Sequence, residues 1–343
     1  MVVYITAFVL TLLFVFLYTR VKKRCYKVCL FILSMLPFWF VSAFRYDVGT
    51  DYFNTYVKYF EHTKIGWHPY KTEPLFQLLN YILVKFNCDV IWLFIITSFI
   101  FIFFVFLTIF KYSKNYYLSI IIFFVSSIYF NSLNNVRQYL ALAIAFYGIL
   151  NPKMFKRIIF LIIATLIHLS SCLLFVIIIL EYFSLNKRKF SAINILMIFI
   201  APFACIIIFY IFKATKYGYF FDTTGTGFSL ALVIVIFLYT FLTWYFYDKN
   251  NISNDLAYMQ IFTFLSVLCS IILQNEEMWM RIIRVFSFSH IILVPCVIQK
   301  CKNSFQKKYI SFALIFSYAI YTFYTVYLMD GLNVFPYKFI FNI

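Results

Sequence analysis

The sequence predicts an all-α, polytopic membrane protein, and its composition carries this prediction. Of the 343 residues, 64% are hydrophobic, 24% are aromatic and only 12% are charged. A soluble domain has about 25% charged residues, which keep its surface hydrated. Because a helix needs roughly 20 apolar residues to cross a bilayer, we expect about 10 to 13 transmembrane helices, some of them short or re-entrant. They would form a single integral membrane domain over residues 1–343.

Apolar runs between charged residues give the expected spans. The first run has no positive charge before it and five Lys or Arg residues after it, at positions 20–27. This order predicts an anchor with its N-terminus outside, not a cleavable signal. In chain order, the expected spans are 2–19, 28–44, 90–110, 116–130, 139–150, 192–212, 229–247, 256–273, 282–298 and 310–328.

The run 158–180 can be read as one span or as a hairpin with its tip near His168. Ser170 and Ser171 follow this histidine and are good residues for starting a second helix. With a hairpin, 18 of the 29 Lys and Arg residues lie on the cytoplasmic side and 11 outside, whereas one span gives 15 against 14. Cytoplasmic loops carry an excess of Lys and Arg, so we favour the hairpin. Most polar clusters then lie at the outer face.

The net charge of +17 does not indicate nucleic-acid binding, because basic loops held in the cytoplasm account for it. The eight cysteines are scattered, without a Cys-x-x-Cys pair or a histidine at ligand spacing. We therefore expect no structural metal, no cofactor and no disulfide framework.

The largest outer segment, residues 45–73, contains three charged candidates for a substrate site: Arg45, Asp47 and Asp51. Gly49 lies among them and predicts a backbone conformation that other residues resist. The following aromatic residues recur at helical spacing, which predicts an interfacial helix with its rings at the level of the lipid headgroups. The alternative is a set of interfacial anchors with a local pair between Arg45 and an aspartate.

Two further candidates come from short, polar-rich segments. Glu73 precedes Pro74, which is favoured in the first turn of a helix, and the apolar length that follows is too short to cross a membrane. Glu73 is either a helix cap or a site residue. Arg137 and Gln138 end the polar run 131–138, which must face protein, water or a polar ligand, since an arginine at the centre of a span costs about 2.5–3.5 kcal/mol. The alternative for Arg137 is a lipid-headgroup anchor.

The remaining candidates are one histidine and two arginines. His168 is an ionisable side chain inside an apolar run, which favours a functional role over a satisfied interior position. Arg281 and Arg284 are three residues apart and share a helix face. The alternative role for Arg281 is an intrahelical salt bridge with Glu277.

These residue types favour an anionic ligand at the outer face. Arginine binds phosphate through two parallel hydrogen bonds and keeps its charge at any relevant pH. The sequence has no phosphate-binding loop, and ATP is not expected outside the cell. A lipid-linked diphosphate sugar suits the interface better. Glycosyl transfer from it needs a base for the acceptor hydroxyl and a cation for the departing diphosphate.

The sequence resembles the EpsG family of Wzy-like membrane proteins. The resemblance rests on FRYDVGTDYFNTY (44–56), EPLF (73–76), NNVRQYLALAI (134–144), ATLIHLSS (164–171) and MRIIRVFSF (280–288). It implies a GT-C-like or Wzy-like outer cavity in a multi-pass protein of the bacterial inner (plasma) membrane. The implied activity is metal-independent polymerisation of undecaprenyl-diphosphate-linked repeat units into a surface polysaccharide such as capsule, exopolysaccharide or O-antigen.

Roles for the candidates follow from this activity as hypotheses. Arg137, with Arg281 or Arg284, would clamp the donor diphosphate, and His168 or Asp47 would take the acceptor proton. The pocket would be shaped by Arg45, Asp51, Glu73 and Gln138. Expected partners are the lipid-linked glycan donor and acceptor, the bilayer, a flippase and a chain-length regulator. The rival hypotheses are a flippase for lipid-linked oligosaccharide and a non-catalytic component of an assembly complex.

Overall fold

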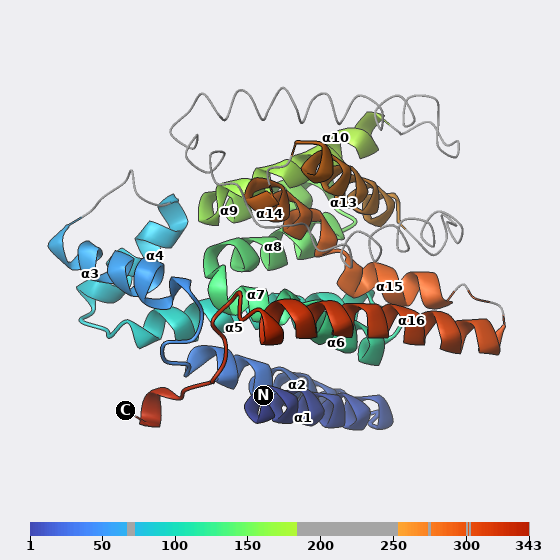
Figure 1. The fold of residues 1–343 in the computed structure, drawn as a ribbon, viewed down its shortest axis with the longest axis horizontal. Coiled ribbons are helices and arrows are strands. Elements are labelled where there is room, and N and C mark those ends of the chain that lie inside the picture. The colour runs from blue at the N-terminus through green and yellow to red at the C-terminus, as the bar shows by residue number, and fades with distance from the viewer. Residues whose placement is uncertain (67–72, 184–252, 274–275, 300, 302, 343) are drawn as a thin grey trace. The chain divides into compact units, whose positions relative to one another are not determined.

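The structure is a computed structural model that describes residues 1–66, 73–183, 253–273, 276–299, 301 and 303–342. The chain divides into two compact units, the first made of Met1–Cys172 and Tyr318–Ile343 and the second of Leu173–Ser317. Within the described residues the regular elements are helices, as Figure 1 shows. The predicted all-α class is therefore confirmed.

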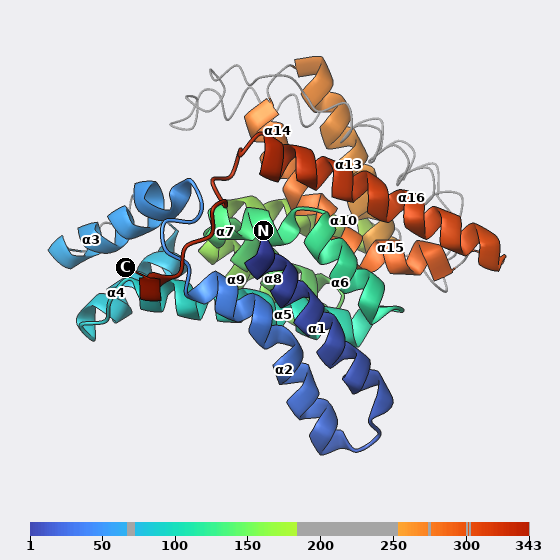
Figure 2. The same cartoon turned by 60° about the horizontal axis from the view of Figure 1, so that its bottom comes forward.

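The first unit begins with two apolar helices joined by a tight turn. α1 (Val2–Arg20) and α2 (Arg24–Ala43) lie side by side in both Figure 1 and Figure 2. The remaining elements of this unit are η1 (Tyr52–Val57), α3 (Lys58–Ile65), α4 (Pro74–Lys85), α5 (Ile91–Tyr112), α6 (Tyr116–Val125), α7 (Ile128–Asn134), α8 (Val136–Ile149), α9 (Met154–Ile167), the start of η2 (Leu169–Leu174), the end of α16 (Ser304–Thr322), η4 (Phe323–Leu328) and η5 (Ile340–Asn342).

Local sequence explains how these helices begin and bend. Asn115 accepts a hydrogen bond from the backbone N–H of Leu118, 3.2 Å away, and so caps α6. Ser127 has a φ of 61°, and there α6 and α7 meet at an angle of 49°. The Ser127 hydroxyl lies 2.6 Å from that of Thr322, which fixes the bend against α16. The expected span 116–130 is thus a broken helix.

The second unit contains α10 (Phe175–Phe183), α13 (Asn254–Leu273), α14 (Glu276–Ser287), α15 (His290–Gln299) and the start of α16. In place of the expected straight span 282–298, Met280–Ser287 and His290–Gln299 meet at 51°. The Nε2 atom of the buried His290 lies 2.6 Å from Oε1 of Gln260 and so joins α15 to α13.

The described residues contain four helices that are long and apolar enough to cross a membrane, or up to six if each bent pair counts as one span. These helices support a multi-pass membrane protein. The expected spans 192–212 and 229–247 lie outside the described residues.

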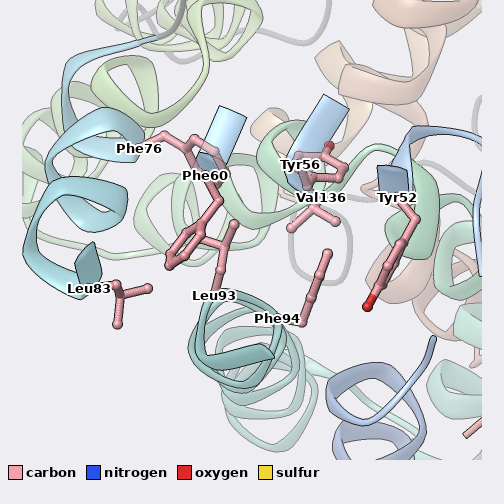
Figure 3. Close-up of a cluster of buried hydrophobic side chains, with 8 residues drawn as sticks. All are labelled: Tyr52, Tyr56, Phe60, Phe76, Leu83, Leu93, Phe94 and Val136. Atoms are coloured by element: carbon pink, nitrogen blue, oxygen red, sulfur yellow. The ribbon is translucent and has the colours of Figure 1, made fainter. Parts of the chain in front are cut away.

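A hydrophobic cluster, rich in aromatic residues, holds η1 and α3 to other helices of the first unit. Figure 3 shows side chains from η1, α3, α4, α5 and α8 pointing toward one another. Its members are Tyr52, Tyr56, Phe60, Phe76, Leu83, Leu93, Phe94 and Val136. The spacing of the aromatic residues predicted the helix correctly. The predicted exposure to lipid headgroups was wrong for Tyr52, Tyr56 and Phe60, because protein buries these rings.

A C-terminal segment, residues 332–340, pairs with the loop that follows α2. The backbone N–H of Tyr46 donates to the carbonyl of Lys338 at 3.0 Å, and that of Gly49 donates to Asn333 at 2.9 Å. The N–H of Ile340 donates in return to Phe44 at 3.0 Å. This pairing gives the loop an ordered backbone where it has no helix of its own.

Gly49 occupies a position that a side chain cannot share. Its φ is +100°, and a Cβ atom built there would lie 2.8 Å from the carbonyl oxygen of Leu133. We expect Gly49→Ala to lower the free energy of unfolding by about 1–3 kcal/mol, because both the backbone strain and the backbone clash act against it. Thermal unfolding in detergent measures the loss. Gly331→Ala is the matched control, since its Cβ would come no closer than 3.4 Å to another atom. Equal melting temperatures for the two variants would contradict this account.

Candidate functional site

The carboxylate of Glu73 joins two other predicted site residues, Arg137 and His168. Its Oε2 atom accepts a hydrogen bond from Nη1 of Arg137 at 2.8 Å. Its Oε1 atom lies 2.7 Å from Nδ1 of His168 and 3.3 Å from the backbone N–H of Leu169, which donates to it. Three segments far apart in the sequence therefore meet at one carboxylate.

Helix ends place these three side chains. Glu73 is the N-cap of α4, and its carbonyl accepts the N–H of Gln77 at 3.0 Å. Arg137 lies in the first turn of α8. His168 directly follows α9 in an extended conformation, with φ −155° and ψ 120°. The helix break predicted at His168 is confirmed, whereas the hairpin around it stays a prediction.

The charges of the cluster keep Glu73 ionised. Burial alone would raise its pKa, but the contact with His168 and the positive charge of Arg137 outweigh burial and lower the pKa of this carboxyl to about 2. About a fifth of each side chain is exposed: 18% for Glu73, and 19% for Arg137 and His168. Glu73 is therefore ionised, and each of the three side chains keeps part of its surface exposed.

Two aromatic rings, one on α3 and one on α4, lie against the guanidinium of Arg137. Its Cζ atom lies 5.4 Å from the ring centre of Tyr59 and 5.6 Å from that of Phe76, which is also drawn in Figure 3. Such cation–π contacts are worth about 0.5–2 kcal/mol each and hold the planar group in one orientation. Burial raises the pKa of the neighbouring Tyr56 to about 12, so its hydroxyl stays protonated.

Gln138 lies next to this cluster. Its side chain is buried, and its Nε2 atom donates to the Ser170 hydroxyl at 3.5 Å, a long hydrogen bond. The structure thus brings four of the predicted site residues together: Glu73, Arg137, Gln138 and His168.

Arg45 lies instead inside the protein, with 2% of its surface exposed. Its guanidinium donates to the carbonyls of Ser42 and Leu133, near the C-terminal ends of α2 and α7, and lies 4.6 Å from the ring centre of Phe94. Arg45 also lines a cavity of about 10 Å³, which has room for a water molecule but not for a sugar or a phosphate. A role of Arg45 in substrate binding stays a prediction, and it would require this cavity to open.

The two aspartates of the outer segment have other partners. Asp47 lies 3.1 Å from Nζ of Lys338, and in the described part of the chain it forms no ion pair with Arg45. Asp51 precedes η1, where its backbone N–H donates to Oδ1 of Asn134 at 2.9 Å. Among the described residues, Asp47 therefore pairs with Lys338 and not with Arg45, and the roles of Asp47 and Asp51 at a site stay predictions.

Arg281 and Arg284 lie on α14 in the second unit, and both side chains are partly buried. Their convergence with Arg137 stays a prediction. The alternative salt bridge to Arg281 involves Glu277, whose side chain lies outside the described ones.

Sequence reasoning missed two contacts that organise the site. Asn134 accepts hydrogen bonds from the Thr50 hydroxyl at 2.7 Å and from the Asp51 N–H, and so connects the loop after α2 to the end of α7, directly before the helix that carries Arg137. The cost of exposing amides to lipid was the signal that Asn134 faces protein. No feature of the sequence indicated that Lys338 contacts Asp47. Among the described residues, no group of three His, Cys, Asp or Glu side chains could hold a metal ion.

The low pKa of Glu73 predicts an acid-sensitive contribution to stability. Its folded value of about 2 lies below the ordinary value of 4.5, so the contribution is complete above about pH 4.5 and is lost as the pH falls toward 2. We expect the wild type to be more stable than Glu73→Gln by up to about 3 kcal/mol at neutral pH. Unfolding in detergent between pH 7 and pH 2 should show this difference shrinking below pH 4.5. A difference that does not change with pH would refute the assignment.

The model of the EpsG family matches residues 28–339. Neither the curated proteins nor the solved structures contain a match. Because the family match covers most of the 343 residues, the chain belongs to the EpsG family.

Proposed function

We propose that the protein polymerises lipid-diphosphate-linked oligosaccharide repeat units into a surface polysaccharide at the outer face of the bacterial inner membrane. The observation that carries this proposal is the cluster of Glu73, Arg137 and His168, in which a carboxylate lies within 2.8 Å of a guanidinium and 2.7 Å of an imidazole and each side chain is about a fifth exposed. Membership of the EpsG family supports an exopolysaccharide product. The lipid is undecaprenyl in this proposal.

The reaction joins an acceptor hydroxyl to the first sugar of the donor. The hydroxyl oxygen forms a bond to the anomeric carbon, and the bond from this carbon to the diphosphate oxygen breaks. The diphosphate leaves with the bonding electrons, and the hydroxyl proton passes to a base. Such a base typically contributes a factor of about 10² to 10⁴ to the rate, and fixed cations lower the energy of the departing anion.

His168 is the base in this proposal, in preference to Asp47. Both were candidates from the sequence. His168 has a carboxylate partner that can stabilise its charged form after proton uptake, with Nδ1 2.7 Å from Glu73. The Asp47 carboxylate is instead paired with Nζ of Lys338 at 3.1 Å.

Arg137 contributes one part of the diphosphate clamp. Its Nη1 atom is engaged with Glu73, and a guanidinium has further N–H groups that can donate to phosphate oxygens. The positive charge of Arg137 is already balanced by Glu73, however, so the charge of a diphosphate requires a second cation. Arg281 or Arg284 supplies it in this proposal.

The experiment that tests the function uses the purified protein in lipid vesicles with one defined lipid-linked repeat unit. A ladder of lengthening products would support a polymerase. Movement of the intact unit across the bilayer without lengthening would instead indicate a flippase. The absence of both, with chain growth restored only on adding other assembly proteins, would indicate a non-catalytic component.

Replacement of His168 tests the base. We expect His168→Ala to slow product formation by about 10²- to 10⁴-fold, because no group then accepts the hydroxyl proton. His62→Ala, on α3 outside the cluster, is the matched control and should retain the wild-type rate. A His168→Ala protein that polymerises at the wild-type rate would show that His168 is not the base.

Replacement of Arg137 by lysine tests the clamp. Lysine keeps the charge but loses the planar fork, so we expect kcat/KM for the lipid-linked unit to fall about 10- to 100-fold, equivalent to one hydrogen bond to a charged group. Arg20→Lys, at the end of α1, is the control for the substitution itself. Unchanged kinetics in Arg137→Lys would remove Arg137 from the clamp.

A further inference from the structure

The Glu73 carboxylate contacts Arg137, His168 and the backbone of Leu169. One oxygen accepts from Arg137, and the other lies against both the His168 ring and the Leu169 backbone N–H. The hydrogen bonds from Arg137 and from the backbone hold the carboxylate in place. A group fixed in this way is suited to orienting a neighbour.

We propose that Glu73 is a positioning residue that keeps a proton on Nδ1 of His168, so that Nε2 is the atom that accepts the proton of the acceptor hydroxyl. This inference rests on the proposed function. It adds to that function the atom of His168 that accepts the proton, Nε2, and the residue that positions His168, Glu73. It differs from a role in binding substrate, in which Glu73 would itself contact the sugar.

The tautomer follows from the chemistry of the two groups. An ionised carboxylate can only accept hydrogen bonds, so a hydrogen on the ring nitrogen beside it is favoured, whereas a lone pair there would be repelled by the anion. In a neutral imidazole the other nitrogen then has the free lone pair. Nδ1 lies 2.7 Å from Oε1 of Glu73 as an ion-pair contact without the angle of a hydrogen bond, and Nε2 is the basic atom in this proposal. Carboxylate partners orient histidine and raise its basicity in the same way at metal sites.

The proton balance of the reaction is complete with these groups. The acceptor O–H bond breaks, its proton binds Nε2, and its oxygen bonds to the anomeric carbon as the diphosphate departs. The ring is then a cation with protons on both nitrogens, next to the Glu73 anion. Transfer of the Nε2 proton to the departing diphosphate or to water restores the neutral ring.

The charged groups around His168 come from two helices. Glu73, at the start of α4, faces the ring directly, and Arg137, on α8, lies behind the carboxylate and is paired with it. On the segment of His168 itself, Cys172 is the nearest titratable residue in sequence. Removing the Glu73 charge therefore removes the anion that stabilises the charged ring and leaves Arg137 to oppose it.

The tautomer can be measured without catalysis. Solid-state NMR of the full protein in lipid, with ¹⁵N-labelled histidine, reports which ring nitrogen carries hydrogen, and the spectrum of His168→Gln identifies the His168 signals. Above the pH at which the ring is neutral, we expect hydrogen on Nδ1 in the wild type and a mixture of tautomers in Glu73→Gln. Hydrogen on Nε2 in the wild type would overturn the proposal.

The split between kcat and KM separates positioning from substrate binding. In Glu73→Gln, we expect kcat to fall about 10- to 100-fold with KM for the lipid-linked unit little changed, because the ring loses the carboxylate that orients it. Glu73→Asp keeps the charge and should recover part of kcat. The control is Glu61→Gln, whose glutamate pairs with Lys64 at the surface. A loss confined to KM would contradict positioning.

Failure of the proposed function and failure of this inference would give different results. If the wild type forms no ladder of products, the proposed function fails, while NMR still decides the tautomer. If the wild type is active but His168→Gln is as fast, the function stands and this inference falls. A double variant supplies a check against misfolding: once His168 is replaced, Glu73→Gln should slow the reaction no further. A further loss of the same size would mean that Glu73 acts independently of His168.

Discussion

Burial of the Arg45 guanidinium is the constraint on which the first unit depends. A cation removed from water is costly unless polar groups replace the water. In the described part of the chain Arg45 has no carboxylate partner, and the C-terminal ends of α2 and α7 provide carbonyl oxygens where the helix dipole is negative. The face of Phe94 adds a third favourable contact. The arginine therefore determines where these two helix ends and α5 meet.

This constraint extends to the candidate site through short, direct contacts. Leu133, which accepts from Arg45, is also the residue against which Gly49 packs without a side chain. The next residue, Asn134, binds the loop at Thr50 and Asp51, and three residues later Arg137 reaches Glu73. Residues 133–137 thus connect the buried Arg45 to the partly exposed cluster of Glu73, Arg137 and His168.

Features that depend on nearby residues could be predicted from the sequence. Composition predicted the membrane class, Pro74 predicted the start of α4, and a histidine inside an apolar run predicted the break at His168. Partners distant in sequence could not be predicted, because neither member carries a local signal: Asp47 and Lys338 are 291 positions apart. The aromatic face of η1 and α3 was assigned to lipid headgroups because helical spacing shows that a face is apolar, but not what covers it.

The pairing of residues 332–340 with the loop after α2 bears on biosynthesis. During translation the loop emerges from the ribosome long before its partner, so the backbone groups of Tyr46, Gly49 and Phe44 first bind water or other groups. The loop after α2 therefore completes its backbone pairing only after residues 332–340 have been made.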